Sequence, residues 1–252
     1  MNRDARFLLI VEGVDELRRL PGLLPEIDAK SYIMLDGQGF RGVRDTCKTL
    51  GSGFDRPYVG VCDRDLRSDD ETIYEEEKAP GLFFLASRCL ENELLHPPLL
   101  MRTLDMAGYE ITEAEIRLTL RAIADGQYQD VHARMVDSEL HRMRDLPLGR
   151  EEGEVPLGGI RRKYEARRDA AQNRLLAMSE VAARIEDDLQ GRWDTEHLAL
   201  LDGKTAMPQL AQQLAPGFKG RGLETAVLRH ARDFPPPGIA ALRAEISRLI
   251  GS

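Results

Sequence analysis

Short apolar runs separated by helical patterns open the chain. Four of these runs have the length of β-strands and are apolar nearly throughout: Phe7–Val11, Ser31–Leu35, Tyr58–Cys62 and Leu82–Leu85. Continuous apolar strands are typical of parallel sheets that are covered on both faces. Helical patterns lie between them at Asp15–Leu24, which we expect to end in the region of Pro21 and Pro25, and at Arg41–Leu50. The pattern therefore predicts an α/β fold with a four-stranded parallel sheet joined by right-handed crossovers.

Beyond Pro97 the pattern is helical. Thr112 and Glu115 form a capping box ahead of one helix, and a second helix is expected at about Asp130–Asp145. A third, long helix should start near Ile160, and its apolar seam should dock on a neighbouring helix through Ala171, Leu175, Met178, Ala182, Ile185 and Leu189. Three short helices should follow, at Met207–Leu214, Leu223–Ala231 and Gly238–Ile250. We therefore divide the chain into an α/β core (1–100), a large helical insertion (101–195) and C-terminal helices that complete the core (196–252).

Composition and charge narrow the class of protein. Of the 252 residues, 42% are hydrophobic and 31% are charged, as in ordinary globular proteins. No segment approaches the roughly 20 apolar residues of a membrane span, so we expect a cytoplasmic protein with no membrane partner. Cys47, Cys62 and Cys89 lack metal-ligand spacing and are odd in number, so we expect them in the core. The formal net charge of −8 disfavours binding to nucleic acid, but acids gather at 63–77 and bases at 161–174.

Acidic residues follow three of the four predicted strands: Glu12 after the first, Asp63 and Asp65 after the third, and Glu91 after the fourth. Because the carboxyl ends of parallel strands meet at one edge of a sheet, we expect these side chains to converge. Converging carboxylates repel one another unless a cation is bound, and Mg²⁺ or Mn²⁺ prefers such oxygen ligands. In an extended backbone, Asp63 and Asp65 would point the same way. The helix after Gly13 would place Glu16 on the same face as Glu12.

Each acidic residue alone also has a structural interpretation. Glu12-Gly13 can be an ordinary turn, the Asp63 and Asp65 pair a helix cap or solvated loop, and Glu91 a cap of its own helix. The occurrence of all of them in this order, each after a strand, favours a metal site.

The acids and their neighbours resemble the Toprim domain. VEG, DRD and LEN occur in the order of that domain, a Rossmann-like metal-binding fold shared by topoisomerases, primases, recombination proteins and the overcoming-lysogenization-defect (OLD) nucleases. VEGVDE, MLDGQGF, VCDRD, SRCLENELLHP and LLDGK are similar to segments of stand-alone OLD-like Toprim proteins from anti-phage defence operons. The resemblance spans roughly residues 6–100 and resumes near residue 200. It implies a nuclease that is the effector of a defence system and is controlled by a partner ABC-type ATPase.

The resemblance implies a role for each matching acid. Glu12 and Glu16 match the paired acids of the VEGxxxE pattern, which hold or tune a first metal ion. Asp63 and Asp65 match the metal-binding DxD pair. Glu91 matches an acid that serves a second ion.

The resemblance also implies a catalytic cation, since Lys204 in the DGK segment matches a late lysine that stabilises charge on the scissile phosphate. Two positions depart from the family pattern and both lie beside the acid for the second ion. Cys89 stands where some relatives have a hydroxyl, and Glu93 stands where many have an aromatic residue.

The expected chemistry follows from the ions. Two Mg²⁺ or Mn²⁺ ions about 4 Å apart can activate a water molecule and stabilise the leaving oxygen of an in-line displacement. We therefore expect hydrolysis of a phosphodiester bond in DNA or RNA, tRNA included. The predicted catalytic residues are Glu12, as metal ligand or general base, with Asp63, Asp65 and Lys204.

Three groups of basic residues are candidate contacts to nucleic acid: Arg161, Arg162 and Lys163; Lys219 and Arg221; and Arg41 and Arg44. The first group could follow a phosphate backbone with Tyr164 stacking on a base, but a solvated helix face is the interpretation that we favour. The second group lies in a Gly-rich loop that could contact nucleic acid. The third group lies at the expected metal edge, where salt bridges to nearby acids are an alternative.

Other functions fit parts of the pattern. A haloacid-dehalogenase-like phosphatase also places DxD after an apolar strand, but it needs an early nucleophilic aspartate where this chain has Glu12. A phosphoacceptor receiver domain gathers acids at strand ends but is much shorter. The Toprim unit could also be a catalytically latent module that binds its partner through the helical middle, and a homodimer is possible.

Overall fold

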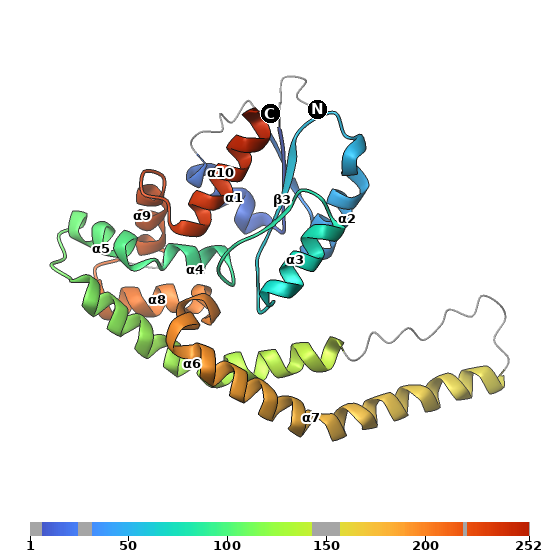
Figure 1. Ribbon diagram of the computed structural model, residues 1–252. Helices are drawn as coiled ribbons and strands as arrows, with labels where there is room; N and C mark the ends of the chain where they lie inside the picture. Colours follow the sequence, from blue (N-terminus) through green and yellow to red (C-terminus); the bar gives the residue numbers. More distant parts are fainter. Residues whose placement is uncertain (1–6, 25–31, 143–156, 219–220, 252) are drawn as a thin grey trace. The chain divides into compact units, whose positions relative to one another are not determined.

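Four parallel strands form the central sheet of the protein (Figure 1). The computed structural model describes residues 7–24, 32–142, 157–218 and 221–251. The strands are β1 (Phe7–Val11), β2 (Tyr32–Asp36), β3 (Tyr58–Cys62) and β4 (Leu82–Phe84). They pair in the order β2-β1-β3-β4, and each pair is parallel. The predicted α/β class and the predicted four-stranded parallel sheet are therefore confirmed.

Helices cover both faces of the sheet. The connecting helices are α1 (Val14–Leu23), α2 (Phe40–Leu50) and α3 (Asp69–Lys78), with a 3₁₀ turn at Gly51–Gly53. Helices α2 and α3 lie on one face of the sheet (Figure 1). On the strands, Leu8 and Ile10 pack in one cluster with Val43 and Cys47 of α2. Pro21 lies inside α1 and does not end it. A proline removes one helical hydrogen bond, which the complete burial of Leu20 and Leu23 in the adjacent turns offsets.

The loop between β2 and α2 passes unusually close to the helix. A Cβ atom at Gly42 would lie 1.7 Å from the carbonyl oxygen of Gly37, which is a backbone atom and cannot rotate away. Gly39 has φ of 95°, a left-handed conformation that glycine adopts at low cost. This close approach fixes the DGQG segment against the start of α2.

We expect Gly42→Ala to lower the free energy of unfolding by about 2 kcal/mol or more, because the added methyl overpacks a backbone contact. The matched control is Gly22→Ala, since nothing lies within 4 Å of a Cβ atom at Gly22 in α1. That change should raise stability by about 0.5–1 kcal/mol, as alanine does in helices. Urea unfolding midpoints measure both effects. Equal stability of the two variants would contradict the close approach.

Five further helices complete the unit that contains the sheet: α4 (Leu90–Leu94), α5 (Pro97–Met106), α8 (Gly203–Leu214), α9 (Gly222–Ala231) and α10 (Pro237–Gly251). This compact unit comprises residues 1–125 and 198–252. Residues 101–125 belong to this unit, whereas we had placed them in the insertion. Helix α9 packs on α1, α4 and α5. The predicted capping box of Thr112 and Glu115 is present. Cys47, Cys62 and Cys89 are buried and unpaired, as expected.

The second unit spans residues 126–197 and contains the C-terminal part of one long helix and most of a second. Helix α6 (Glu113–Arg142) is continuous where we had predicted two helices, and it is followed by α7 (Leu157–Leu200). Within this unit Tyr128 packs edge-on against Trp193 at 4.8 Å between ring centroids. No helix in the described ranges is long and apolar enough to cross a membrane.

The predicted apolar seam of α7 is buried in only one half. Ile185 and Leu189 are buried, as expected of a docked helix. Leu175 and Met178 are 68% and 45% exposed, so the prediction that the whole seam docks is wrong for this half. The ring of His132 on α6 meets the carbonyl of Ala182, and the buried positions of α7 begin beside this contact at Val181.

Candidate metal centre

The ends of β1 and β3 bring two carboxylates together. The strands pair in parallel with Val11 opposite Val61, so the residues that follow them are neighbours. One carboxylate oxygen of Glu12 accepts the backbone N–H of Asp63 at 2.9 Å. Burial raises the pKa of Glu12, and the nearby charge of Asp65 raises it further.

Asp63 lies at the centre of the predicted acids. Burial raises its pKa to about 8, and the carboxylates of Glu16, Glu12, Asp65 and Glu91 contribute in that order. The Oδ1 atom of Asp63 is buried without a hydrogen-bond partner. Glu16 itself is 7% exposed, although it is the third residue of helix α1. Asp63 is therefore within electrostatic range of the other four acids that were predicted from the sequence.

Asp65 differs from its prediction. Its φ of 53° is left-handed, so the extended backbone ends before it and the pair does not keep the strand geometry that would point both acids one way. The backbone N–H of Asp65 donates to the carbonyl of Arg88 at 2.8 Å. Its exposed carboxylate pairs at 2.8 Å with Arg67, whose guanidinium lies 4.1 Å from the centre of the Phe40 ring. Arg67 was not among the residues predicted from the sequence.

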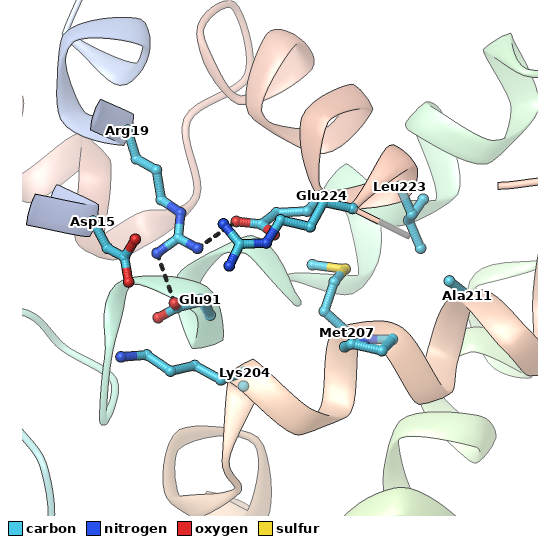
Figure 2. Close-up of a pocket in the computed structure, with 11 residues that line it drawn as sticks. Asp15, Arg19, Glu91, Lys204, Met207, Ala211, Leu223 and Glu224 are labelled. Atoms are coloured by element: carbon cyan, nitrogen blue, oxygen red, sulfur yellow. Dashed lines mark hydrogen bonds and ion pairs between the residues drawn. The ribbon is translucent and has the colours of Figure 1, made fainter. Parts of the chain in front are cut away.

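Glu91 is held by an arginine that the sequence analysis also missed. Glu91 is 3% exposed, and its Oε1 atom meets Arg19 Nη1 at 2.7 Å. The other terminal nitrogen of Arg19 meets Glu224 of α9, also at 2.7 Å (Figure 2). The Oε2 atom of Glu91 is buried without a partner. The thiol of Cys89 lies beside it, but a thiol has one proton and Cys89 donates it to Asn92 Oδ1 at 2.9 Å.

The LEN and DGK segments are joined by one amide side chain. Asn92 Nδ2 donates to the carbonyls of Leu198 at 2.8 Å and Leu201 at 2.9 Å. Its Oδ1 atom accepts the N–H of Gly203 at 3.2 Å. A Cβ atom at Gly203 would lie 2.7 Å from the backbone nitrogen of Asn92, so only glycine fits this approach. Asn92 therefore fixes the loop that leads into Lys204.

Lys204 reaches the group of carboxylates from α8. Burial lowers its pKa, but the charges of Glu91, Asp63 and Glu16, together with Cys89, outweigh this and hold the pKa above its ordinary value. Lys204 therefore remains protonated at neutral pH. The structure thus brings this predicted residue to the predicted acids, although more than a hundred residues separate it from Glu91 along the chain.

Glu93 has a structural role at the position where it departs from the family pattern. It is 4% exposed and accepts the N–H groups of Ser87 at 3.0 Å and Gly238 at 3.1 Å. Gly238 lies in the first turn of α10, so Glu93 connects that helix to the sheet edge.

A pocket of about 130 Å³ lies beside Glu91 and Lys204 (Figure 2). Arg221, a predicted contact to nucleic acid, lines it together with the apolar side chains of Met207 and Leu223. The pocket therefore has a charged side and an apolar side next to the acids.

The other basic candidates do not all reach this site. Arg44 pairs with Asp45 at 3.1 Å and lies 3.7 Å from Glu75. It therefore forms the salt bridges that were the alternative to a nucleic-acid contact. Arg41 is exposed in the first turn of α2. Helix α7 contains residues 161–163, but the side chains of Arg161, Arg162 and Lys163 lie outside the described part, as does all of Lys219.

The donor atoms fit a hard divalent cation, although they do not yet form a ligand cage. Among the described residues, no three acidic, histidine or cysteine side chains are already arranged around one metal position. Asp65 and Glu91 each form an ion pair with an arginine. Two buried carboxylate oxygens, Asp63 Oδ1 and Glu91 Oε2, remain without a donor, and buried acceptors of this kind are costly unless a cation or donor satisfies them.

Comparison of the chain with protein-family models and with curated proteins gives no match.

Proposed function

We propose that this protein is a metal-dependent nuclease that hydrolyses phosphodiester bonds in DNA or RNA. The observation that carries the proposal is the carboxylate of Asp63, whose Oδ1 atom is buried without a hydrogen-bond partner and whose pKa is raised to about 8 by burial and then by four neighbouring carboxylates. Mg²⁺ or Mn²⁺ held by Glu12, Glu16, Asp63, Asp65 and Glu91 would relieve this repulsion. The resemblance of the sequence to the Toprim nucleases of the OLD family supports the same chemistry.

The side chains would divide the work as follows. When bound, the metal supplies Lewis-acid activation of water and of the phosphate. Lys204, which stays protonated beside the acids, would stabilise negative charge on the phosphate undergoing attack. Glu12 has a raised pKa, which suits a group that accepts a proton from water. Arg221 would hold a neighbouring phosphate at the pocket.

Control by a partner ATPase in an anti-phage defence system belongs to the same proposal and rests on the resemblance. One feature of the second unit supports a docking role beside catalysis. Leu175, Leu176 and Met178 expose 68%, 75% and 45% of their surface on α7, and exposed apolar groups of this kind mark contact surfaces.

The proposal is tested by incubating the full chain with Mg²⁺ or Mn²⁺ and a panel of plasmid, single-stranded DNA and total tRNA. The assay is run alone and with the ABC-type ATPase encoded nearby, if there is one. We expect metal-dependent cleavage of one substrate class, and a loss of at least about 100-fold in Asp63→Ala. The matched control is Asp70→Ala, which changes an exposed aspartate of α3. Full cleavage by Asp63→Ala would overturn the assignment.

A further inference from the structure

Arg19 joins two carboxylates that lie more than a hundred residues apart along the chain. It lies on α1 and bridges Glu91 of α4 and Glu224 of α9, with 2.7 Å to each. The side chains are 10%, 4% and 13% exposed for Arg19, Glu91 and Glu224. Both terminal nitrogens of the guanidinium are used, as Figure 2 shows, so the planar group has one preferred orientation. A buried triad of one arginine between two carboxylates fixes geometry more than it adds stability.

The consequence of this bridge is seen at Glu91. Arg19 occupies its Oε1 atom, while Oε2 is buried and has no donor. Among the predicted acids, Asp63 Oδ1 is the other carboxylate oxygen that is buried without a donor. The negative charge of Glu91 contributes to the raised pKa of Asp63. Arg19 therefore holds Glu91 by one oxygen and leaves the other without a hydrogen-bond donor.

Glu224 determines the net charge of the group formed by Arg19, Glu91 and Glu224, and therefore how strongly this group attracts a cation. Arg19 and Glu91 alone form a neutral pair, which would attract a metal ion weakly. With Glu224 the three groups carry a formal charge of −1, so the negative charge of Glu91 is kept although Arg19 touches it. Partners in the layer behind metal ligands orient those ligands and set their basicity.

We propose that Arg19 and Glu224 are positioning residues of the metal centre, which orient Glu91 as a ligand and preserve its charge. This inference rests on the proposed metal-dependent function. It gives helix α9, which is remote in sequence from the acids, a part in metal binding. It also gives the C-terminal segment a reason to return to the sheet unit beyond packing alone.

The test is calorimetric titration of Mn²⁺ into the full chain, without substrate. We expect Glu224→Gln, which alters no proposed ligand, to weaken Mn²⁺ binding by about 10-fold. Arg19→Lys should weaken it similarly, because an ammonium keeps the charge but lacks the planar fork that holds two carboxylates. Matched controls are Arg18→Lys, at an exposed arginine of the same helix, and Glu110→Gln, at an exposed acid. Both controls should bind as the unaltered protein does. Thermal unfolding of each variant verifies that it is folded.

The outcomes separate this inference from the proposed function. If Asp63→Ala loses Mn²⁺ binding while Glu224→Gln and Arg19→Lys bind as the unaltered protein does, the metal centre stands and the positioning role is overturned. Tighter binding in Arg19→Lys, or uptake of an additional ion, would make Arg19 a competing counter-ion and would overturn it too. Absence of Mn²⁺ binding to the unaltered protein would overturn both.

Discussion

Asp63→Asn should make the metal-free protein more stable while it removes cleavage activity. The pKa of Asp63 is about 8 in the folded protein, so its charged form is unfavourable in the fold at neutral pH and above. An asparagine carries no charge, and it offers an N–H group to the surrounding carboxylates. We expect a gain in the free energy of unfolding of about 2 kcal/mol at pH 8, which is less than the full pKa difference would imply because the neighbouring carboxylates titrate together.

The raised pKa of Asp63 determines the direction in which stability changes with pH. An acid whose pKa is higher in the folded than in the unfolded chain contributes stability that is fully present below the unfolded value of 3.8 and is lost as the pH rises through about 8. The advantage of Asp63→Asn over the unaltered protein should therefore be small at pH 5 and grow up to about pH 8. Urea unfolding in the presence of a chelator, from pH 5 to pH 9, measures it.

With bound metal, the unaltered protein should become more stable than Asp63→Asn. A ligand that binds only the folded state, at 100 times its dissociation constant, adds about 2.7 kcal/mol of stability. Mn²⁺ should give this gain to the unaltered protein and little of it to Asp63→Asn. Asp70→Asn, at an exposed aspartate, is the control that should show neither effect. A variant Asp63→Asn that is less stable than the unaltered protein at pH 8 without metal would mean that Asp63 is a structural residue.

The sheet and the convergence of the acids were predictable because both depend on short-range patterns. Apolar runs of strand length identified the strands, and the geometry of a parallel sheet requires residues after neighbouring strands to meet. Glu12 and Asp63 meet for this reason. Lys204 could be placed only through the resemblance, because no periodicity links α8 to the sheet edge. The metal, the nucleic acid and the partner ATPase stay predictions.

The residues that sequence reasoning missed are those whose partners lie far away along the chain. Arg19 reads as a surface arginine of an amphipathic helix, since nothing near it in sequence indicates Glu91 or Glu224. The left-handed backbone at Asp65 was missed because aspartate in a loop adopts several conformations. Two helices were predicted where the structure has the single helix α6. The helix continues through Gly126 because an interior glycine costs only about 1 kcal/mol and the buried side chains of Ile123 and Val131 anchor the helix on either side of it.

Asn92→Ala is the second change for which we expect a large effect, since the amide of Asn92 on α4 holds the loop that leads into Lys204 on α8. Its removal would leave the carbonyls of Leu198 and Leu201 and the N–H of Gly203 without their partner. Buried groups that lose a partner cost about 1–3 kcal/mol each, so we expect a loss of about 3 kcal/mol in the free energy of unfolding. The loop that carries Lys204 would then be free to move away from the acids.

Comparison with Lys204→Met separates the two roles of this contact. If the proposed function holds, both variants should lose cleavage by about 100-fold, because each removes the lysine charge from the phosphate. Asn92→Ala should lose much more stability than Lys204→Met, since Asn92 is buried and Lys204 is exposed. Asn92→Asp sharpens the test, because it keeps the size of the side chain but turns a carboxylate oxygen towards two carbonyls. It should be at least as destabilised as Asn92→Ala, and native stability in either variant would show that the amide does not hold the loop.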